Sequence, residues 1–518
     1  MTGRDFAAAQ SALAANSFAS RGMILSDGIR AAASRTPSKV AVAESGRSLT
    51  YRQLLERNDR VSSLAAGLGL QFGDRVAIMA PNCIEYVELV CGLSANGHPV
   101  AKIGPAAGGP EISFILEHSG AKLLFVHRTL LDKVMAVDRA AVRQVIVIGG
   151  DYEDLLARAK AIESTAPVNE RDTFSIPYTS GSTGKPKGVM LSHRARILNA
   201  FATAVEHGCY SPDDRALGTT PMFHGAGFLN VITPLFFGGF VEILPRFDIE
   251  QLLGRVERLR ATVVNMIPTH FSAMLALEEK TGRRFDLSSV KCVFSGTAPL
   301  PQSMKAPIIE RFGEGKLNER YGSTEAGVVS CLRPSDQLRR IQCVGLPMPL
   351  THVKILDKDG NEAAPNTVGE LWSRSPYMFN GYWDAPEATA KSLRDGWFSA
   401  GDLARVDEEG YVYIVDRKND MIISGGENIY PREVEEVLLT HPAVAECAVV
   451  GLPHEYWGEA VTAFVALKPD RHASDRDLVD HCATVLTRFK LPKTVQFVDR
   501  LPRNSMGKIL RRDLRTMK

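Results

Sequence analysis

The chain has 518 residues, of which 45% are hydrophobic and 23% charged. This is the composition of a globular protein too long for a single hydrophobic core, so we expect two or more domains. Lysine and arginine total 61 against 59 for aspartate and glutamate, which gives a net charge of +2. This balance gives no reason to expect a nucleic acid or an anionic membrane as partner.

Helical and strand-like segments alternate through the first 300 residues. Apolar residues recur at helical spacing in 51–68 and 85–93, which predicts a helix in each range. Short apolar runs predict strands at 75–79, 122–126, 144–148, 241–244, 262–267 and 290–295. Strands separated by helices favour an α/β fold with largely parallel sheets.

The pattern changes after about residue 345. Short strands are expected at 352–356, 369–373 and 411–415, and the turns between them suit hairpins, which predicts a small β subdomain. From residue 419 the pattern predicts helix 432–440, strand 444–450, strand 460–467, helix 475–487 and strand 494–498. The predicted fold class is α/β: a large N-terminal domain of parallel-rich α/β sheets with the β subdomain over 1–418, and a small α+β C-terminal domain over 419–518.

The strongest local motif is the segment 178–188, Tyr-Thr-Ser-Gly-Ser-Thr-Gly-Lys-Pro-Lys-Gly. Its glycines let backbone N–H groups approach phosphate oxygens, its hydroxyls donate, and its lysines neutralise charge, so it suits a polyphosphate. It precedes Ser192, the predicted N-cap of a helix over 193–206. Thr179 and Pro186 stand where a Walker A loop needs glycine and Ser or Thr, so a P-loop NTPase is excluded. Taken alone, the segment also fits a flexible surface loop.

This motif resembles the signature loop of the adenylate-forming superfamily, which includes acyl-CoA synthetases, peptide-synthetase adenylation domains and firefly-type luciferases. Further motifs continue the resemblance in order over roughly residues 25–515. The resemblance implies ATP-dependent activation of a carboxylic acid to an acyl-adenylate, followed by thioester formation with CoA and release of pyrophosphate and AMP. It implies that ATP phosphates are held by Thr179, Ser180, Gly181, Ser182, Thr183, Gly184, Lys185 and Lys187, with Thr183 also catalytic.

The segment 318–325, Asn-Glu-Arg-Tyr-Gly-Ser-Thr-Glu, resembles the adenine and metal motif of the superfamily. The resemblance makes Tyr321 the flat partner of adenine, Thr324 a ligand of the α-phosphate, and Glu325 a catalytic residue and the ligand of Mg²⁺. Upstream, 295–299 resembles the turn that lines the adenine and acyl pockets. The other nucleotide-binding residues that these two motifs imply are Gly296, Thr297, Ala298, Gly322 and Ser323.

Three later motifs complete the implied adenylation site. In 397–402, Asp402 resembles the carboxylate that accepts hydrogen bonds from both ribose hydroxyls. In 416–421, Arg417 resembles the ribose-contacting arginine, and Asn419 occupies the interdomain hinge, where relatives usually carry Asp or Lys. Lys508, in the segment 502–508, resembles the catalytic lysine that offsets charge on the α-phosphate and the acid.

The resemblance assigns the thioester step to the C-terminal part. Ser424, Gly425 and Gly426 match a loop that replaces the catalytic lysine when the small, mobile domain rotates. A plain hairpin turn is the alternative for the two glycines. Phe489, with Lys490 and Lys493, is a candidate for holding the CoA nucleotide, and Trp457 is either near the pantetheine tunnel or a core residue.

The segment 221–230 resembles the wall of the acyl pocket, with Phe223, His224 and Phe228 as candidate substrate residues and His224 also catalytic. His224 stands where amino-acid-selecting domains carry Asp, which disfavours an α-amino acid. The segment 101–110 departs from the Pro-Leu-Asn-Pro-Arg of many relatives, which predicts an altered loop near the acyl entrance or no effect.

The expected partners are a small carboxylic acid and CoA, with ATP and Mg²⁺ as cofactors. A carrier-protein thiol or an amine is the alternative acceptor, and a non-catalytic nucleotide-binding relative is a second alternative. The eight cysteines form no CxxC pair, and neither a membrane span nor a targeting signal is expected, so the predicted location is the cytoplasm. A homodimer is left open.

Overall fold

Buried apolar strands followed by helices build the first sheet of this protein, as its computed structural model shows for the described residues 21–180, 186–503 and 509–517. Strands β3 and β4 are buried along their whole length because helices cover both faces. The sequence of β3 is apolar throughout, and that of β4 is apolar except for Lys102. The sheet runs β6-β5-β3-β4-β7-β8, with β9 on β7. Its strands are β3 (Val76–Met79), β4 (Val100–Ile103), β5 (Leu123–His127), β6 (Gln144–Ile148), β7 (Thr173–Ser180), β8 (Pro186–Gly188) and β9 (Leu191–Ser192).

Helices surround this sheet, and some of them begin at residues that favour a helix N-cap. The predicted helix 51–68 is α4, whose N-cap Thr50 accepts from the Gln53 amide while the Gln53 side chain accepts from the Thr50 amide. Ser192 caps α9 as expected, accepting from Ala195 N. The helices of this half are α3 (Leu25–Arg35), α4 (Tyr51–Gly67), α5 (Ile84–Ala95), α6 (Gly109–Ser119), α7 (Leu131–Met135), α8 (Tyr152–Arg158), α9 (His193–His207) and α10 (Gly225–Phe236).

The second sheet has a parallel part with antiparallel strands on both sides of it, in the order β19-β20-β18-β21-β22-β16-β15-β14-β13-β12-β10-β11-β1-β2 with β17 on β18. Its parallel part is β1 (Val40–Glu44), β10 (Arg215–Gly218), β11 (Phe240–Ile243), β12 (Val263–Met266), β13 (Cys292–Ser295) and β14 (Leu317–Ser323). The antiparallel strands are β2 (Arg47–Thr50), β15 (Gly327–Leu332), β16 (Cys343–Pro347), β17 (His352–Leu356), β18 (Gly369–Arg374), β19 (Leu393–Arg394), β20 (Trp397–Phe398), β21 (Asp402–Val406) and β22 (Val412–Arg417). The strands β16 to β22 are the predicted β subdomain. Helices α11 (Ile249–Leu259), α12 (Pro268–Thr281), α13 (Gln302–Phe312) and α14 (Pro386–Ser392) join the strands.

A third, smaller sheet forms the C-terminal part, in the order β24-β23-β26-β25 with β27 on β26. Its elements are β23 (Ile422–Ser424), β24 (Glu427–Ile429), α15 (Pro431–Leu438), β25 (Val444–His454), β26 (Gly458–Leu467), α16 (Asp475–Ala483), β27 (Thr494–Phe497) and α17 (Arg511–Leu514). The predicted helix 475–487 is four residues too long, since β-branched Thr484 and Val485 follow the end of α16.

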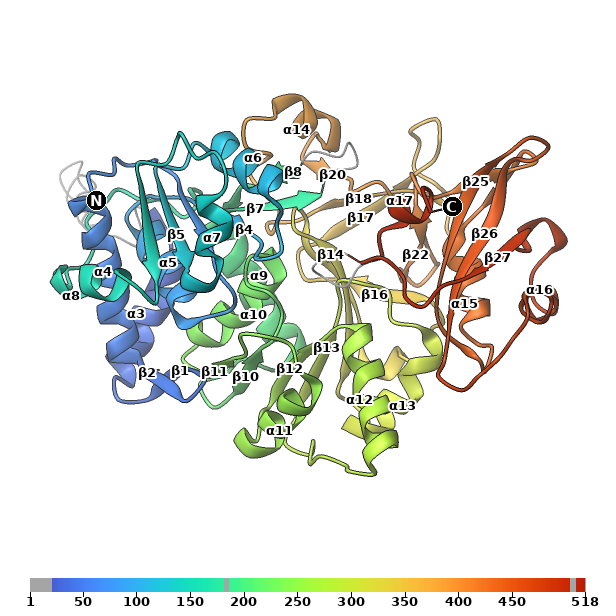
Figure 1. The fold of residues 1–518 in the computed structure, drawn as a ribbon, viewed down its shortest axis with the longest axis horizontal. Coiled ribbons are helices and arrows are strands. Elements are labelled where there is room, and N and C mark those ends of the chain that lie inside the picture. Colours follow the sequence, from blue (N-terminus) through green and yellow to red (C-terminus); the bar gives the residue numbers. More distant parts are fainter. Residues whose placement is uncertain (1–20, 181–185, 504–508, 518) are drawn as a thin grey trace, which may run out of the picture.

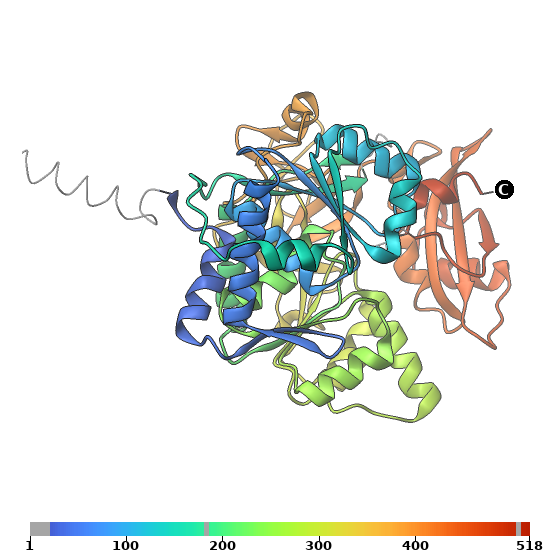
Figure 2. The ribbon, with the colours of Figure 1, turned by 60° about the vertical axis from the view of Figure 1, so that its left-hand side comes forward.

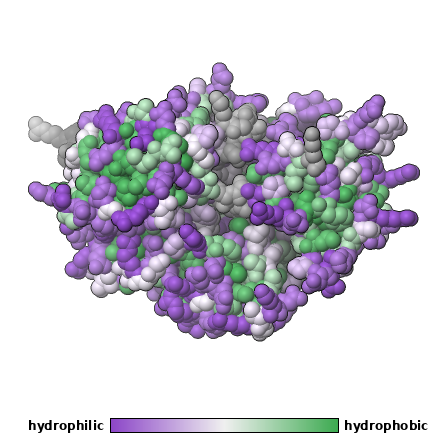
Figure 3. All heavy atoms as spheres, viewed as in Figure 1, coloured by the Kyte–Doolittle hydropathy of each residue, from purple (hydrophilic) through white to green (hydrophobic). Residues whose placement is uncertain are grey.

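The expected α/β fold, with a large N-terminal domain and a smaller C-terminal one, is confirmed. The C-terminal sheet lies at the opposite end of the molecule from α3 and α4 (Figures 1 and 2). It meets the β subdomain where Arg432 N donates to Asp416 Oδ2 at 2.9 Å and Arg432 Nη1 to Ile414 O at 3.1 Å. In Figure 3, hydrophilic residues surround the edge of the view, and hydrophobic patches lie over the first sheet and over the C-terminal sheet. Among the described residues, no helix has the length and apolarity to cross a membrane.

Candidate active site

The two ends of the predicted phosphate segment, 178–180 and 186–188, lie on paired strands. Strand β7 pairs antiparallel with β8, so that Thr179 lies opposite Lys187. The Lys187 ammonium stands 5.0 Å from the centre of the Tyr382 ring, and the Tyr382 hydroxyl donates to Glu325 Oε1 at 2.9 Å. Burial and the Glu325 carboxylate both raise the pKa of Tyr382, so its hydroxyl keeps the proton that it donates. One tyrosine thus joins these paired strands to the predicted metal ligand.

A buried arginine lies beside the same carboxylate. Arg196 of α9 is 4% exposed and its Nη2 donates to Thr324 O at 2.9 Å. Burial lowers the pKa of Arg196 to about 10, and the charge of Glu325 opposes this decrease. The guanidinium therefore remains a cation at neutral pH, fixed behind the segment 323–325. Within the described residues, Glu325 Oε2 has no hydrogen-bond partner.

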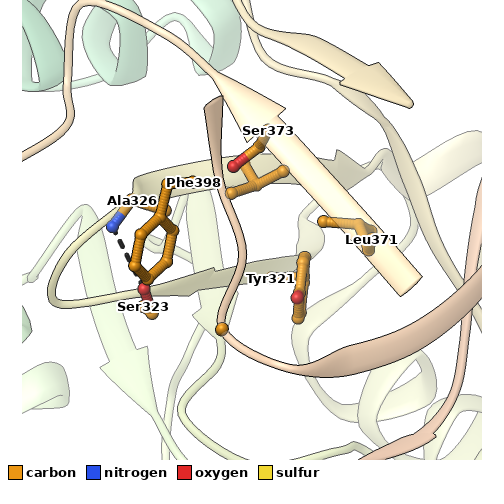
Figure 4. Close-up of a pocket in the computed structure, with 8 residues that line it drawn as sticks. Tyr321, Ser323, Ala326, Leu371, Ser373 and Phe398 are labelled. Atoms are coloured by element: carbon orange, nitrogen blue, oxygen red, sulfur yellow. Dashed lines mark hydrogen bonds between the residues drawn. The ribbon is translucent and has the colours of Figure 1, made fainter. Parts of the chain in front are cut away.

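A chain of three side chains forms the predicted ribose end. The Tyr321 hydroxyl donates to Asp402 Oδ2 at 2.6 Å, and Arg417 Nε lies 3.5 Å from Asp402 Oδ1. Burial first, and then the Asp402 charge, hold the pKa of Tyr321 well above its usual value. Tyr321 also borders a small cavity beside Phe398 (Figure 4). The cavity is lined by Tyr321, Ser323, Ala326, Val329, Leu371, Ser373, Phe398 and Ala400.

Two tight backbone positions fix the strand that carries Tyr321. The pairing of β14 with β15 shifts register between Tyr321 and Gly322, and a Cβ on Gly322 would overlap the carbonyl of Gly327. The neighbouring turn 295–299 packs against β14, since a Cβ on Gly296 would stand 3.3 Å from Arg320 O. Thr297 of this turn has φ of 67°, a left-handed conformation that is uncommon for a residue with a branched side chain.

The predicted acyl segment is the start of helix α10. Gly227 has no room for a side chain, because its Cβ would overlap the carbonyl of Pro221. Gly225 packs against Thr324, whose methyl carbon would stand 3.2 Å from a Cβ at that position. Phe228 is 2% exposed, one turn further along the helix. The start of α10 therefore extends from the phosphate side of the site toward the interior.

His224 is the N-cap residue of α10 and its ring contacts that of Phe223, with ring centres 3.9 Å apart and the ring planes tilted by 41°. Burial, with a smaller contribution from the Lys102 charge, lowers the pKa of His224 to about 3. Its Nε2 is buried and has no hydrogen-bond partner within the described part of the chain. At neutral pH the imidazole is therefore uncharged and can orient a substrate, but it cannot neutralise a carboxylate.

Comparison with known proteins agrees with this arrangement. Residues 29–383 match the family model described as AMP-binding enzyme, and residues 433–508 match the AMP-binding enzyme C-terminal domain. This chain belongs to the AMP-binding enzyme family. A feruloyl-CoA synthase of Amycolatopsis sp is 38% identical over 93% of this chain and 96% of that protein. A fatty acid–[acyl-carrier-protein] ligase ScoC of Streptomyces coeruleorubidus is 35% identical over 93% and 94%. The solved anthranilate CoA ligase AuaEII in complex with anthranoyl-AMP superposes with a TM-score of 0.89 at 28% identity, covering 95% of this chain and 97% of that one.

In this AMP-binding enzyme, the C-terminal segment 424–427 closes the hairpin of β23 and β24. Gly425 has φ of 60°, its N–H donates to Trp457 O at 2.8 Å, and a Cβ there would meet the Trp457 ring at 3.1 Å. Trp457 thus lies against the loop and not in the core, and Phe489 is 39% exposed on the same domain.

The predicted hinge lies in the turn between β22 and β23. Asn419 O accepts from Arg515 Nη2 at 3.5 Å, and the next residue, Asp420, has Oδ2 3.5 Å from Arg511 Nη1 and Oδ1 3.1 Å from Arg515 Nη2. Two basic residues of the last helical segment therefore hold this turn in the present arrangement of the domains.

The structure brings predicted residues of the large domain together. It places Ser424 on β23, Gly425 and Gly426 in the turn that follows, and Phe489 in a short 3-10 helix of the C-terminal part. Six of the predicted residues lie outside the described part of the chain: Gly181, Ser182, Thr183, Gly184, Lys185 and Lys508. The prediction missed Arg196 and Tyr382. Arg196 could have been found from the sequence, because it stands at helical spacing from Ala200 and Thr203, on a face of α9 that is buried.

Proposed function

We propose that this AMP-binding enzyme activates a carboxylic acid with ATP and transfers the acyl group from the adenylate to the thiol of CoA, releasing pyrophosphate and then AMP. The observation that carries the proposal is a set of contacts on one segment of chain. Arg417 and Asp402 reach Tyr321, and just beyond the end of the same strand Glu325 accepts from Tyr382, whose ring faces Lys187. The set offers partners for each of the three parts of ATP: the ribose, the adenine and the phosphates.

In the adenylation step, Asp402 accepts hydrogen bonds from the ribose and Tyr321 offers its ring to adenine. Lys187 neutralises phosphate charge, and Arg196 keeps the segment that carries Thr324 in place. Glu325 fits Mg²⁺, because one carboxylate oxygen has no partner among the described residues and Mg²⁺ is usually held by one or two carboxylates with substrate phosphates. When bound, Mg²⁺ supplies charge neutralisation at those phosphates.

We assign the catalytic lysine to Lys508, whose charge offsets the negative charge that builds up as the acid attacks the α-phosphorus. For the second step we assign the domain boundary to Asn419, with the C-terminal domain rotating there. The Gly425 hairpin and the exposed Phe489 then serve the pantetheine and the nucleotide of CoA. The glycine hairpin lets backbone approach a ligand closely.

A carrier-protein thiol is the second candidate acceptor, because a relative of 35% identity is named a fatty acid–[acyl-carrier-protein] ligase. CoA is preferred, because most of the named relatives of similar identity are CoA ligases.

The test is acid-dependent release of pyrophosphate over a panel of aliphatic and aryl acids, with the thioester and AMP scored with and without CoA. Lys508→Ala is expected to lower adenylation about 10²- to 10³-fold, whereas Lys468→Ala, an exposed lysine of the same domain, leaves it unchanged. Pyrophosphate release without acyl-CoA would transfer the proposal to a carrier protein. The absence of ATP binding would overturn it.

A further inference from the structure

Lysine 102 is buried deep in the N-terminal domain without a counter-ion. It belongs to β4, opposite Pro177 of the strand that leads to the predicted phosphate segment, and is 2% exposed. Its Nζ lies 3.4 Å from Met222 O, a long contact that uses one of its three hydrogen-bond directions. Across the described residues, no carboxylate forms an ion pair with this amine, and the groups that act on it include no carboxylate.

The acidic residues of helix α5, which packs beside β4, are already paired. Glu85 and Glu88 of α5 flank Tyr86, whose ring faces the amine, but Glu85 Oε1 lies 2.6 Å from Arg47 Nη2. Glu88 is fully buried between Arg57 Nε at 2.6 Å and the Tyr152 hydroxyl at 2.9 Å. The charged and titratable groups that do act on the amine are Arg196, Cys91 and His224.

Aromatic rings surround the amine instead. Its Nζ stands 4.0 Å from the centre of the Phe228 ring, 5.7 Å from Tyr86 and 6.0 Å from Phe174. The Tyr86 hydroxyl and His224 Nε2 are buried nearby and, in the part of the chain that the structure describes, have no hydrogen-bond partner. Three polar groups without adequate partners in an apolar cage cost free energy unless a ligand satisfies them.

The amine and the reacting end of the site lie along one segment. Gly225 packs against Thr324 on the phosphate side, and three residues later Phe228 packs against Lys102. The segment 101–110 also touches this wall, since a Cβ on Gly104 would stand 2.9 Å from the Phe223 ring. A substrate with its carboxylate at Thr324 and its body along the start of α10 points toward Lys102.

We propose that Lys102 selects the acid, by binding an oxygen substituent on the acyl body, a phenolic hydroxyl or a second carboxylate, at the end remote from the reacting carboxylate. The inference rests on the proposed adenylation function. Burial lowers the pKa of Lys102 well below its usual value, so the amine can accept from a phenol when neutral and donate to a carboxylate when protonated. Either substrate oxygen gives the desolvated Lys102 amine a hydrogen-bond partner.

The experiment compares acids in matched pairs: 4-hydroxycinnamate with cinnamate, and adipate with hexanoate. The readout is the ratio of kcat/KM for pyrophosphate release within each pair. Wild-type enzyme is expected to prefer the oxygen-bearing member of one pair by about 10- to 100-fold, the value of one charged or buried hydrogen bond. The favoured pair distinguishes a phenol from a carboxylate.

Lys102→Met keeps the length and apolar stem and is expected to bring the ratio close to one. Lys133→Met is the control: this exposed lysine also bonds the 101–110 segment, at Pro105 O, but from the solvent side, and its loss leaves the ratio unchanged. A wild-type enzyme that turns over both members of each pair equally overturns the inference and leaves the proposed function standing, whether or not the variant folds. No turnover of any acid overturns both. An unchanged ratio in folded Lys102→Met overturns the role of Lys102 alone.

Discussion

Within the described residues, two lysines are almost fully buried, and they are held in opposite ways. Lys305 of α13, 1% exposed, has its Nζ 2.8 Å from Glu319 Oε2 of β14, and the carboxylate is itself buried. Lys102, 2% exposed, faces rings and one carbonyl oxygen. The Lys305 pair joins a helix to the strand that carries Tyr321. The contacts of Lys102 hold no two elements together in a way that requires a charged side chain.

This difference in pairing distinguishes a lysine that stabilises the fold from one that we propose binds a ligand. Burying a charge costs free energy, and a partner carboxylate offsets that cost only where it is close and hydrogen-bonded. Lys305 meets this condition in the folded chain, and Lys102 does not. A buried, unpaired charge that destabilises the fold is expected at positions where function requires it.

The largest expected effect is the loss of the paired lysine. Lys305→Met leaves the Glu319 carboxylate buried and uncompensated, which is expected to lower the free energy of unfolding by about 3–5 kcal/mol. Calorimetry should show a lower melting temperature for the large domain. The double variant Lys305→Met/Glu319→Gln removes both charges and should recover much of the loss. A single variant as stable as the wild type would end the distinction between the two lysines.

The unpaired lysine should behave in the opposite way. Lys102→Met removes a desolvated amine, so stability at pH 7 should stay equal or increase by about 1 kcal/mol. The native pKa of Lys102 is lowered, so between that value and the unfolded value of about 10.4 the unfolded chain binds the extra proton. Wild-type stability therefore rises with pH in this window, and the advantage of Lys102→Met should narrow from pH 7 to pH 9. Urea unfolding at both values measures it; a widening gap would contradict the assignment.

The elements that could be predicted are those with a strong local pattern. The helix over 51–68 and the strand 144–148 were found because apolar spacing and capping residues are local information. Helix α10 was missed because Gly225, Gly227 and Pro234 are weak helix formers, and tertiary packing overrides their preference.

The residues of the candidate site likewise fall into two groups: those that local motifs predicted and those that only the fold brings into the site. Asp402, Tyr321 and Glu325 lie in contiguous motifs, so the order of the sequence was sufficient to propose them. Tyr382 acts on a carboxylate 57 residues away, and Lys102 contacts a carbonyl 120 residues away. No spacing rule links such positions, because the contacts form only when the two sheets and α10 assemble. The sequence showed that the segment 101–110 is unusual, but it did not predict that Lys102 is buried.

The smallest expected effect is a change in the titration of His224. Burial is the main reason why its pKa is about 3, and the Lys102 charge lowers it further. In Lys102→Met the second contribution disappears and the first remains, so the midpoint should rise by a fraction of a pH unit and stay below the usual value of about 6.5. NMR of ¹³C-labelled histidine rings, assigned with His224→Gln, follows the titration. Lys133→Met, which removes an exposed charge, should leave the midpoint where it is. An unchanged midpoint in Lys102→Met would show that the amine does not act at the acyl wall, and the two buried lysines would then differ in pairing but not in function.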